Sequence, residues 1–139
     1  MGTAIDTSVL ILAQRGGDLE AYLNEEGEPY YVPALAAAEY LLGVHLVKSK
    51  RIQQQAQAFY LLNIKPIVSA FDETDAEQLA LLNFDLKESG QTLQLYDASI
   101  AATALGRGDA LMTADGDFDR VKGLRVKKVS PARSPRSPG

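Results

Sequence analysis

Residues 96–118 read YDASIAATALGRGDALMTADGDF, and most of the expected fold follows from this segment. Small and apolar side chains at 100, 101, 104 and 105 recur at helical spacing from Asp97, which predicts a helix with one buried face. Gly108 suits the end of that helix and a tight turn. Ala110–Thr113 is too short and apolar to be anything but a covered strand.

Acidic side chains stand at both ends of this helix and strand. Asp97 heads the helix, where its carboxylate either caps the helix or lines a site, and Asp115 and Asp117 follow the strand. In open α/β sheets, ligands bind beyond the carboxyl ends of the parallel strands. We therefore expect Asp115 and Asp117 to face a crevice.

The rest of the chain alternates between strand and helix patterns. A first strand ends at about Asp6, and Thr7 or Ser8 suits the cap of the helix that follows. The other expected strands are Tyr30–Val32, Pro66–Ala70 and Arg125–Val129. The other expected helices are Pro33–Lys48, Arg51–Leu62 and Thr74–Ser89, with shorter helical pieces at Asp18–Glu26 and Phe118–Val121. This alternation suits right-handed crossovers and predicts an α/β fold, with a central parallel sheet flanked by helices on both faces.

Length and composition favour one domain. The chain has 139 residues, 46% of them apolar, and we expect one folded domain over residues 1–129. Residues 130–139 (SPARSPRSPG) have nothing apolar to bury and are expected to form a disordered Pro/Ser/Arg tail. Because no apolar run reaches 18 residues and no signal peptide is visible, we expect a cytoplasmic protein without a membrane segment.

The residue types limit the chemistry. The sequence has no cysteine and one histidine, which excludes disulfides, thiolate nucleophiles and cysteine-ligated zinc. Catalysis would therefore rely on carboxylates, hydroxyls or a hard metal ion. A net charge of −4 argues against tight non-specific binding of nucleic acid. However, seven of the 14 basic residues lie between Arg120 and Arg136, and no acid follows Asp119, so the sequence allows a basic patch beside the acidic loop.

Two further carboxylates lie in apolar segments. Asp6 interrupts the apolar run at the start of the chain, and Glu39 lies four residues after Leu35 and three before Leu42, on a predicted stripe that continues to Leu46. Glu39 is therefore expected to point inward. Charged side chains are almost never fully buried unless they are paired or bind a metal.

Each acid has an ordinary structural alternative. A helix-cap or loop role would explain Asp6, Asp97, Asp115 and Asp117. An ion pair with a buried arginine would explain Glu39. Taken one at a time, these alternatives are at least as good as a functional role. Taken together they fail, because the predicted sheet brings all of these segments to one edge and few basic residues occur in the predicted core.

Several unpaired carboxylates in one crevice would repel one another and raise each other's pKa values. A divalent cation removes this conflict, and an all-oxygen site favours Mg²⁺ or Mn²⁺. Such sites commonly act on phosphate groups, which predicts phosphodiester hydrolysis. Ser8 and Thr113 are the nearest hydroxyls, and we expect them to hold a carboxylate or a water molecule, with capping as an equally weighted alternative.

Four motifs carry a family resemblance. IDTSVLI with Asp6, AAEYLLG with Glu39, YDASIAATAL with Asp97, and LMTADGDF with Asp115 and Asp117 together resemble the PIN-domain ribonucleases, in particular the VapC-type toxins of toxin-antitoxin modules. The likeness extends from about Ile5 to Val129. It implies that Asp6, Glu39, Asp97 and Asp115 are catalytic and bind Mg²⁺ or Mn²⁺, with Asp117 as a further acid of the site. It also implies an RNA substrate, a homodimer, and an antitoxin that wraps the toxin and blocks the crevice with a basic side chain.

Three functional hypotheses follow. The first is a metal-dependent endoribonuclease that acts as a toxin. The second is a PIN-like regulatory module that acts through a partner protein, although the presence of every acid argues against a vestigial site. The third is a Mg²⁺-dependent phosphatase or receiver-type protein in which Asp6 is the nucleophile or phosphoacceptor.

Overall fold

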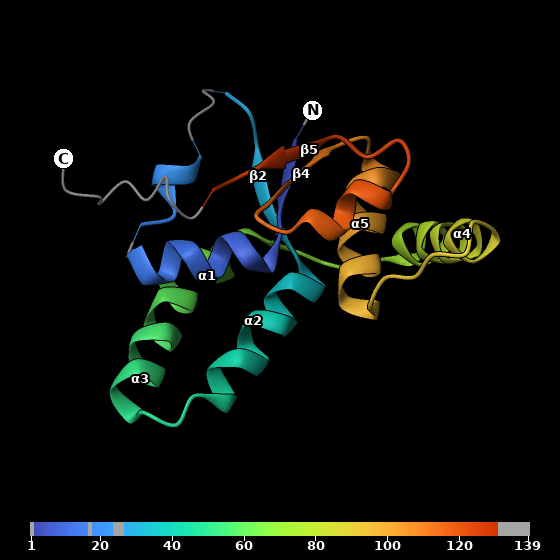
Figure 1. The fold of residues 1–139 in the computed structure, drawn as a ribbon. Helices are drawn as coiled ribbons and strands as arrows, with labels where there is room; N and C mark the ends of the chain where they lie inside the picture. Colours follow the sequence, from blue (N-terminus) through green and yellow to red (C-terminus); the bar gives the residue numbers. More distant parts are fainter. Residues whose placement is uncertain (1, 17, 24–26, 131–139) are drawn as a thin grey trace.

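The computed structural model describes residues 2–16, 18–23 and 27–130. Five strands form one sheet in the order β3-β2-β1-β4-β5, and every neighbouring pair is parallel (Figure 1). The strands are β1 Thr3–Ile5, β2 Tyr30–Pro33, β3 Val68–Ser69, β4 Ala110–Thr113 and β5 Val126–Lys128. The predicted α/β fold with a parallel sheet is confirmed. Nearly all of the predicted tail, from residue 131 onward, lies outside the described residues.

Helices flank the sheet, with α1 and α5 on opposite sides of the strands in Figure 1. The α-helices are α1 Thr7–Gly16, α2 Ala34–Leu46, α3 Lys50–Phe59, α4 Glu73–Glu88 and α5 Leu95–Arg107. Single turns or short 3-10 and π segments are η1 Glu20–Tyr22, η2 Tyr60–Ile64, η3 Lys65–Ile67 and η4 Gly116–Arg120. None of the helices in the described part of the chain has the length and apolar character that a membrane crossing requires.

The strand order places a crevice at the ends of β1 and β4. The chain leaves β1 toward β2 and β3, then returns to β4 on the other side of β1. Connections from the carboxyl ends of β1 and β4 therefore diverge, and ligand sites in such sheets form where the order reverses. Asp6 follows β1 directly, and Asp115 lies two residues after β4.

The buried face of α2 differs from the predicted stripe. Its buried residues are Ala36, Ala37, Tyr40 and Val44, whereas Leu42 and Leu46 are 47% and 70% exposed. The stripe prediction was wrong because it followed the leucines. The helix instead packs through the neighbouring face, which combines two small alanines with Tyr40 and Val44.

Two shorter elements were also predicted too long. Only one 3-10 turn, Glu20–Tyr22, forms within the helical piece expected at Asp18–Glu26, of which residues 24–26 lie outside the described part. The strand expected at Pro66–Ala70 is limited to β3, because Pro66 lies in the preceding 3-10 turn η3. Proline has no N–H to donate to a ladder, so it suits a turn better than a strand.

Asp75, in the first turn of α4, is a buried acid that is only 1% exposed. It forms a reciprocal capping box with Asp72, in which each carboxylate accepts from the other residue's backbone N–H at 3.0 and 2.9 Å. Nη2 of Arg107 donates to its Oδ2 at 3.2 Å, and Nη1 of Arg107 reaches Ser69. Asp75 is thus a buried charge with a partner, which joins the start of α4 to the end of α5.

We expect Asp75→Ala to lower the free energy of unfolding by about 2–4 kcal/mol, since it removes one half of the capping box and leaves the half-buried side chain of Arg107 without its acid. Glu77→Ala, on an exposed position of the same helix, is the matched control and should change stability by less than about 0.5 kcal/mol. Urea denaturation of both variants measures the difference. Equal midpoints for the two variants would contradict a structural role for the Asp75–Arg107 pair.

Candidate metal centre

Asp6 is held rigidly at the end of β1. Its backbone N–H donates to the carbonyl of Met112 in β4 at 2.9 Å, and its side chain is 3% exposed. Oδ2 accepts hydrogen bonds from the hydroxyls of Ser8 and Thr113, each at 2.7 Å. Burial raises the pKa of Asp6 above its ordinary value, and these hydrogen bonds partly offset that rise.

The same two hydroxyls join the loops that follow β1 and β4. Oγ of Ser8 accepts from the backbone N–H of Ala114 at 2.9 Å, and Oγ1 of Thr113 accepts from that of Asp115 at 2.9 Å. Asp115 in turn caps η4 by accepting from the N–H of Asp117 at 2.9 Å. Ser8 and Thr113 thus contact a carboxylate of the site, and they also fix the acidic loop against α1.

Glu39 reaches the site from α2 and is oriented by Thr7. The hydroxyl of Thr7 donates to Oε1 of Glu39 at 2.7 Å. From the sequence, Thr7 was expected only as a candidate helix cap, and its contact with Glu39 was not predicted. Gln94, the residue before α5, also lines the site and was missed. Thr7 was detectable as a polar residue directly after Asp6 in an apolar run, but no sequence signal indicated Gln94.

All five predicted acids line one pocket of about 280 Å³. Its lining residues are Asp6, Thr7, Ser8, Ile11, Glu39, Gln94, Asp97, Asp115 and Asp117. Asp97 lies half-buried in the first turn of α5. Burial, and then the charges of the four other acids, raises the pKa of Asp97 to about 6. The pocket therefore concentrates negative charge at a site that is partly shielded from solvent.

Three of these acids lie close enough to share an ion. Asp97, Asp115 and Asp117 each offer a carboxylate oxygen, and these oxygens all lie within 4.8 Å of one another. Asp6 and Glu39 border the same pocket outside this group. Among the described residues, Asp117 is the only one of the five acids that pairs with a basic side chain, Arg120 at 3.6 Å.

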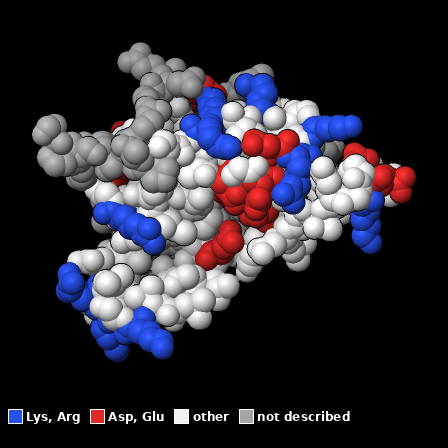
Figure 2. All heavy atoms as spheres, in the orientation of Figure 1, with Lys and Arg blue, Asp and Glu red and all other residues white. Residues whose placement is uncertain are grey.

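The donor set fits a hard divalent cation. Every charged donor is a carboxylate oxygen, and the polar residues beside them are hydroxyls and one amide. In the view of Figure 2, which has the orientation of Figure 1, acidic side chains gather as a patch in the middle of the visible surface. A cation at this patch would remove the repulsion that raises the pKa of Asp97.

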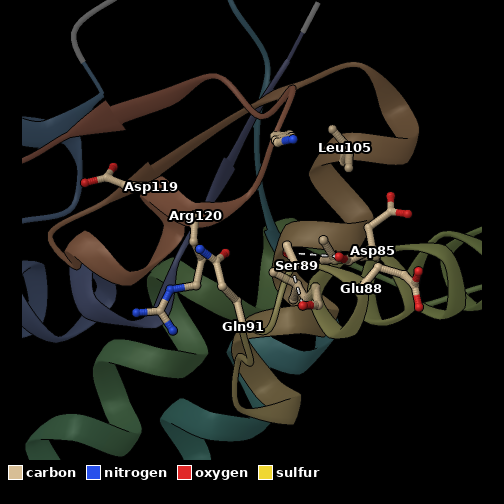
Figure 3. Close-up of a pocket in the computed structure, with 10 residues that line it drawn as sticks. Asp85, Glu88, Ser89, Gln91, Leu105, Asp119 and Arg120 are labelled. Carbon is tan, nitrogen blue, oxygen red and sulfur yellow. Dashed lines mark hydrogen bonds between the residues drawn. The ribbon is translucent and has the colours of Figure 1, made fainter.

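A larger cavity of about 670 Å³ lies beside η4, between α4 and α5 (Figure 3). Its acids do not converge: Asp85 and Glu88 lie on the α4 side, and Asp119 lies on the opposite side. Within the described residues, a group of three acids with oxygens near one point occurs only at Asp97, Asp115 and Asp117. The smaller acidic pocket is therefore the candidate site.

Comparison with known proteins gives matches along most of the chain. The PIN domain family matches residues 3–124. Ribonuclease VapC1 of Rickettsia felis is 34% identical over 133 residues, which cover 94% of this chain and 98% of the relative. VapBC-5 of Mycobacterium tuberculosis, a member of the VapBC family of toxin-antitoxin systems, superposes with a TM-score of 0.72 at 28% identity, covering 93% of this chain and 98% of the other. VapBC2 of Rickettsia felis, solved bound to a DNA fragment from its promoter, gives a TM-score of 0.80 at 20% identity, covering 94% and 100%, and shows a shared fold.

Proposed function

We infer the function from one premise, that this chain belongs to the PIN domain family and, within it, to the VapC ribonucleases. It is therefore a nuclease. We propose that it is an endoribonuclease that depends on Mg²⁺ or Mn²⁺, hydrolyses RNA phosphodiester bonds, and acts as the toxin of a toxin-antitoxin pair. The observation that carries this proposal is the convergence of five carboxylates on one pocket, three of them within reach of a single ion.

The acids have distinct positions in this proposal. Asp97, Asp115 and Asp117 hold the ion directly, because their oxygens already lie near one point. Asp6 and Glu39 border the same pocket and complete the set of oxygen donors around the ion and its waters. A bound divalent cation lowers the pKa of water at the site and offsets the charge that develops on the phosphate.

Three hydroxyls keep these carboxylates in place. Ser8 and Thr113 donate to Oδ2 of Asp6, and Thr7 donates to Oε1 of Glu39. These contacts orient the two carboxylates before substrate arrives, so the site loses little freedom when the ion and RNA bind.

Cleavage of RNA by the purified chain tests the proposal. We expect cleavage with Mg²⁺ or Mn²⁺, complete inhibition by a chelator, and recovery when excess ion is restored. RNA that stays intact with both ions, together with calorimetry that detects no ion binding at millimolar Mg²⁺, would instead favour a regulatory module that acts through a partner. Cleavage that continues in chelator would exclude the metal centre.

Two partner proteins complete the proposal. Solved relatives in VapBC toxin-antitoxin complexes support a cognate antitoxin protein as one partner. A second copy of this chain, forming a homodimer, is the other. Growth arrest on expression, relieved by co-expression of the neighbouring antitoxin gene, tests the first. Sedimentation equilibrium of the purified chain tests the second, and a monomer at all concentrations would exclude the homodimer.

We expect Thr113→Val to reduce the RNA cleavage rate by about 10- to 100-fold, because it removes a hydrogen bond that orients Asp6 and another that fixes Asp115. The substitution keeps the shape of the side chain, so a thermal melt should show a folded protein. Thr103→Val, at a buried threonine of α5 outside the pocket, is the control and should cleave at the wild-type rate. Equal rates for Thr113→Val and wild type would exclude this positioning role.

A further inference from the structure

The basic residues near the end of the chain separate into two groups. Nη2 of Arg125 donates to the carbonyl of Gly108 at 3.5 Å, and Nζ of Lys127 pairs with Glu28 at 3.1 Å. These two are engaged away from the acidic pocket. Arg120, Lys122 and Lys128, which we call the cationic rim, instead lie on or beside the acidic loop that follows β4. Arg133 and Arg136 fall outside the described residues.

Arg120 lies next to the acidic pocket through its contact with Asp117, and it also lines the larger cavity beside η4. Its Nη1 donates to the carbonyl of Thr92 at 2.6 Å, in the segment that leads into α5, and its Nη2 lies 3.6 Å from Oδ1 of Asp117. One guanidinium thus links the segments that carry Asp97 and Asp117. Its side chain is 38% exposed, so its outer face is available to a ligand that approaches the pocket.

Lys128 and Lys122 extend the rim. Nζ of Lys128 lies 3.4 Å from Oδ2 of Asp119, and a Cβ on Gly116 would lie 3.6 Å from the same nitrogen. The ammonium group therefore rests over the turn that begins η4. Lys122 is exposed, lines the larger cavity two residues after η4, and has no ion pair with any described residue. Figure 2 shows basic side chains directly beside the acidic patch.

The pairs that Arg120 and Lys128 make are easily exchanged. Both are exposed and long, at 3.6 and 3.4 Å, with the acids 56% and 67% exposed. Exposed ion pairs add little stability, so a phosphate can replace the carboxylate at small cost. A divalent cation held by Asp117 would also weaken the attraction of Asp117 for Arg120, which leaves the guanidinium available to a phosphate.

A docking surface is needed because the protein and its pocket both repel RNA. The chain carries a net charge of −4, and the five site acids add a concentrated negative field. We propose that the cationic rim of Arg120, Lys122 and Lys128 binds the phosphodiester backbone of single-stranded RNA and leads it along the acidic loop into the pocket. This inference rests on the proposed ribonuclease function and names the surface that its substrate uses.

The salt dependence of RNA binding tests the rim. The probe is a short fluorescein-labelled single-stranded RNA of mixed sequence. Its binding is measured by fluorescence anisotropy with Ca²⁺ in place of Mg²⁺ or Mn²⁺, and a gel verifies that the RNA stays intact. For single strands, each phosphate contact adds about 0.7 to the slope of log K against log salt. We expect Arg120→Gln and Lys128→Gln each to reduce the slope by about 0.7, and the triple Gln variant of the rim to reduce it by about 2.

A matched triple variant controls for net charge. Lys48, Lys50 and Arg51 are exposed beyond the end of α2 that lies away from Glu39, and their change to Gln removes the same charge. This control should keep the wild-type slope. Arg120→Lys should also keep the wild-type slope, because the positive charge remains. If Arg120 acted only through its hydrogen bond to Thr92, Lys and Gln would both weaken RNA binding.

The outcomes separate the two proposals. Wild-type protein that cleaves RNA, combined with equal slopes for the rim and control variants, would overturn the rim and leave the ribonuclease function intact. Wild-type protein that neither binds nor cleaves RNA would overturn both. Reduced slopes for the rim variants alone, with normal thermal melts, would establish the surface.

Discussion

Asp97→Asn is expected to reduce RNA cleavage by at least about 1,000-fold, equivalent to about 4 kcal/mol of activation free energy. Asp97 lies at the centre of the acidic set: its oxygen is within 4.8 Å of those of Asp115 and Asp117, and Asp6 and Glu39 act on its pKa. Asparagine keeps the shape of the side chain but supplies a neutral and weaker oxygen donor. The ion would then bind poorly and in a different position.

The same substitution should make the ion-free protein more stable, not less. The pKa of Asp97 is raised to about 6, so its ionised form is disfavoured in the folded state at neutral pH. Because this carboxyl is half-buried, solvent screens part of the effect, and we expect a gain of about 1 kcal/mol, or about 3 °C in Tm. A loss of activity caused by misfolding would instead lower the Tm.

Asp85→Asn is the matched control for Asp97→Asn. Asp85 is an exposed acid on α4 that lines the larger cavity and not the acidic pocket. It should cleave RNA at the wild-type rate and melt at the wild-type temperature. If Asp97→Asn cleaves RNA as fast as this control, the acidic pocket is not the catalytic site.

Adding Mg²⁺ or Mn²⁺ at pH 8 is expected to raise the Tm by about 9 °C when the ion is at about 100 times its dissociation constant. At pH 5 the increase should be much smaller. The pKa of Asp97 is about 6, so at pH 5 this carboxyl is mostly protonated in the folded state and a proton must leave before the ion binds. Differential scanning fluorimetry across this pH range measures both effects.

The sign of the ion-free pH dependence follows from the same shift. The folded pKa of Asp97 is raised from 3.8 to about 6, so its stabilising contribution is complete below about pH 4 and is lost as the pH rises through 6. The difference in stability between wild type and Asp97→Asn should therefore be near zero at pH 4 and reach its full value above pH 6. A difference that stays constant with pH would mean that Asp97 is not in a crowded acidic environment.

The sequence alone was sufficient for the fold and for the list of acids. The helix that carries Asp97, the turn at Gly108 and the strand Ala110–Thr113 are local patterns, and the structure forms all three, although the helix begins at Leu95, two residues before Asp97. Alternation of such units left a parallel sheet as the only simple arrangement. Asp6, Glu39 and Asp97 were identifiable because a charged side chain in an apolar segment is costly to bury unless it has a partner or a bound ion, and this holds whichever residues surround it in space.

Tertiary structure decided everything that depends on which side chains meet. Whether Asp75 is solvated or buried depends on Arg107, which is 32 residues away in sequence. The contact of Thr7 with Glu39 depends on how α1 lies against α2, since these two residues are also 32 positions apart in sequence. Composition and periodicity are local properties, so they identify the acidic and hydroxyl side chains that could form a site. The close grouping of Asp97, Asp115 and Asp117, and the placing of Arg120 beside it, exist only because the fold brings segments that are remote in sequence to the ends of β1 and β4.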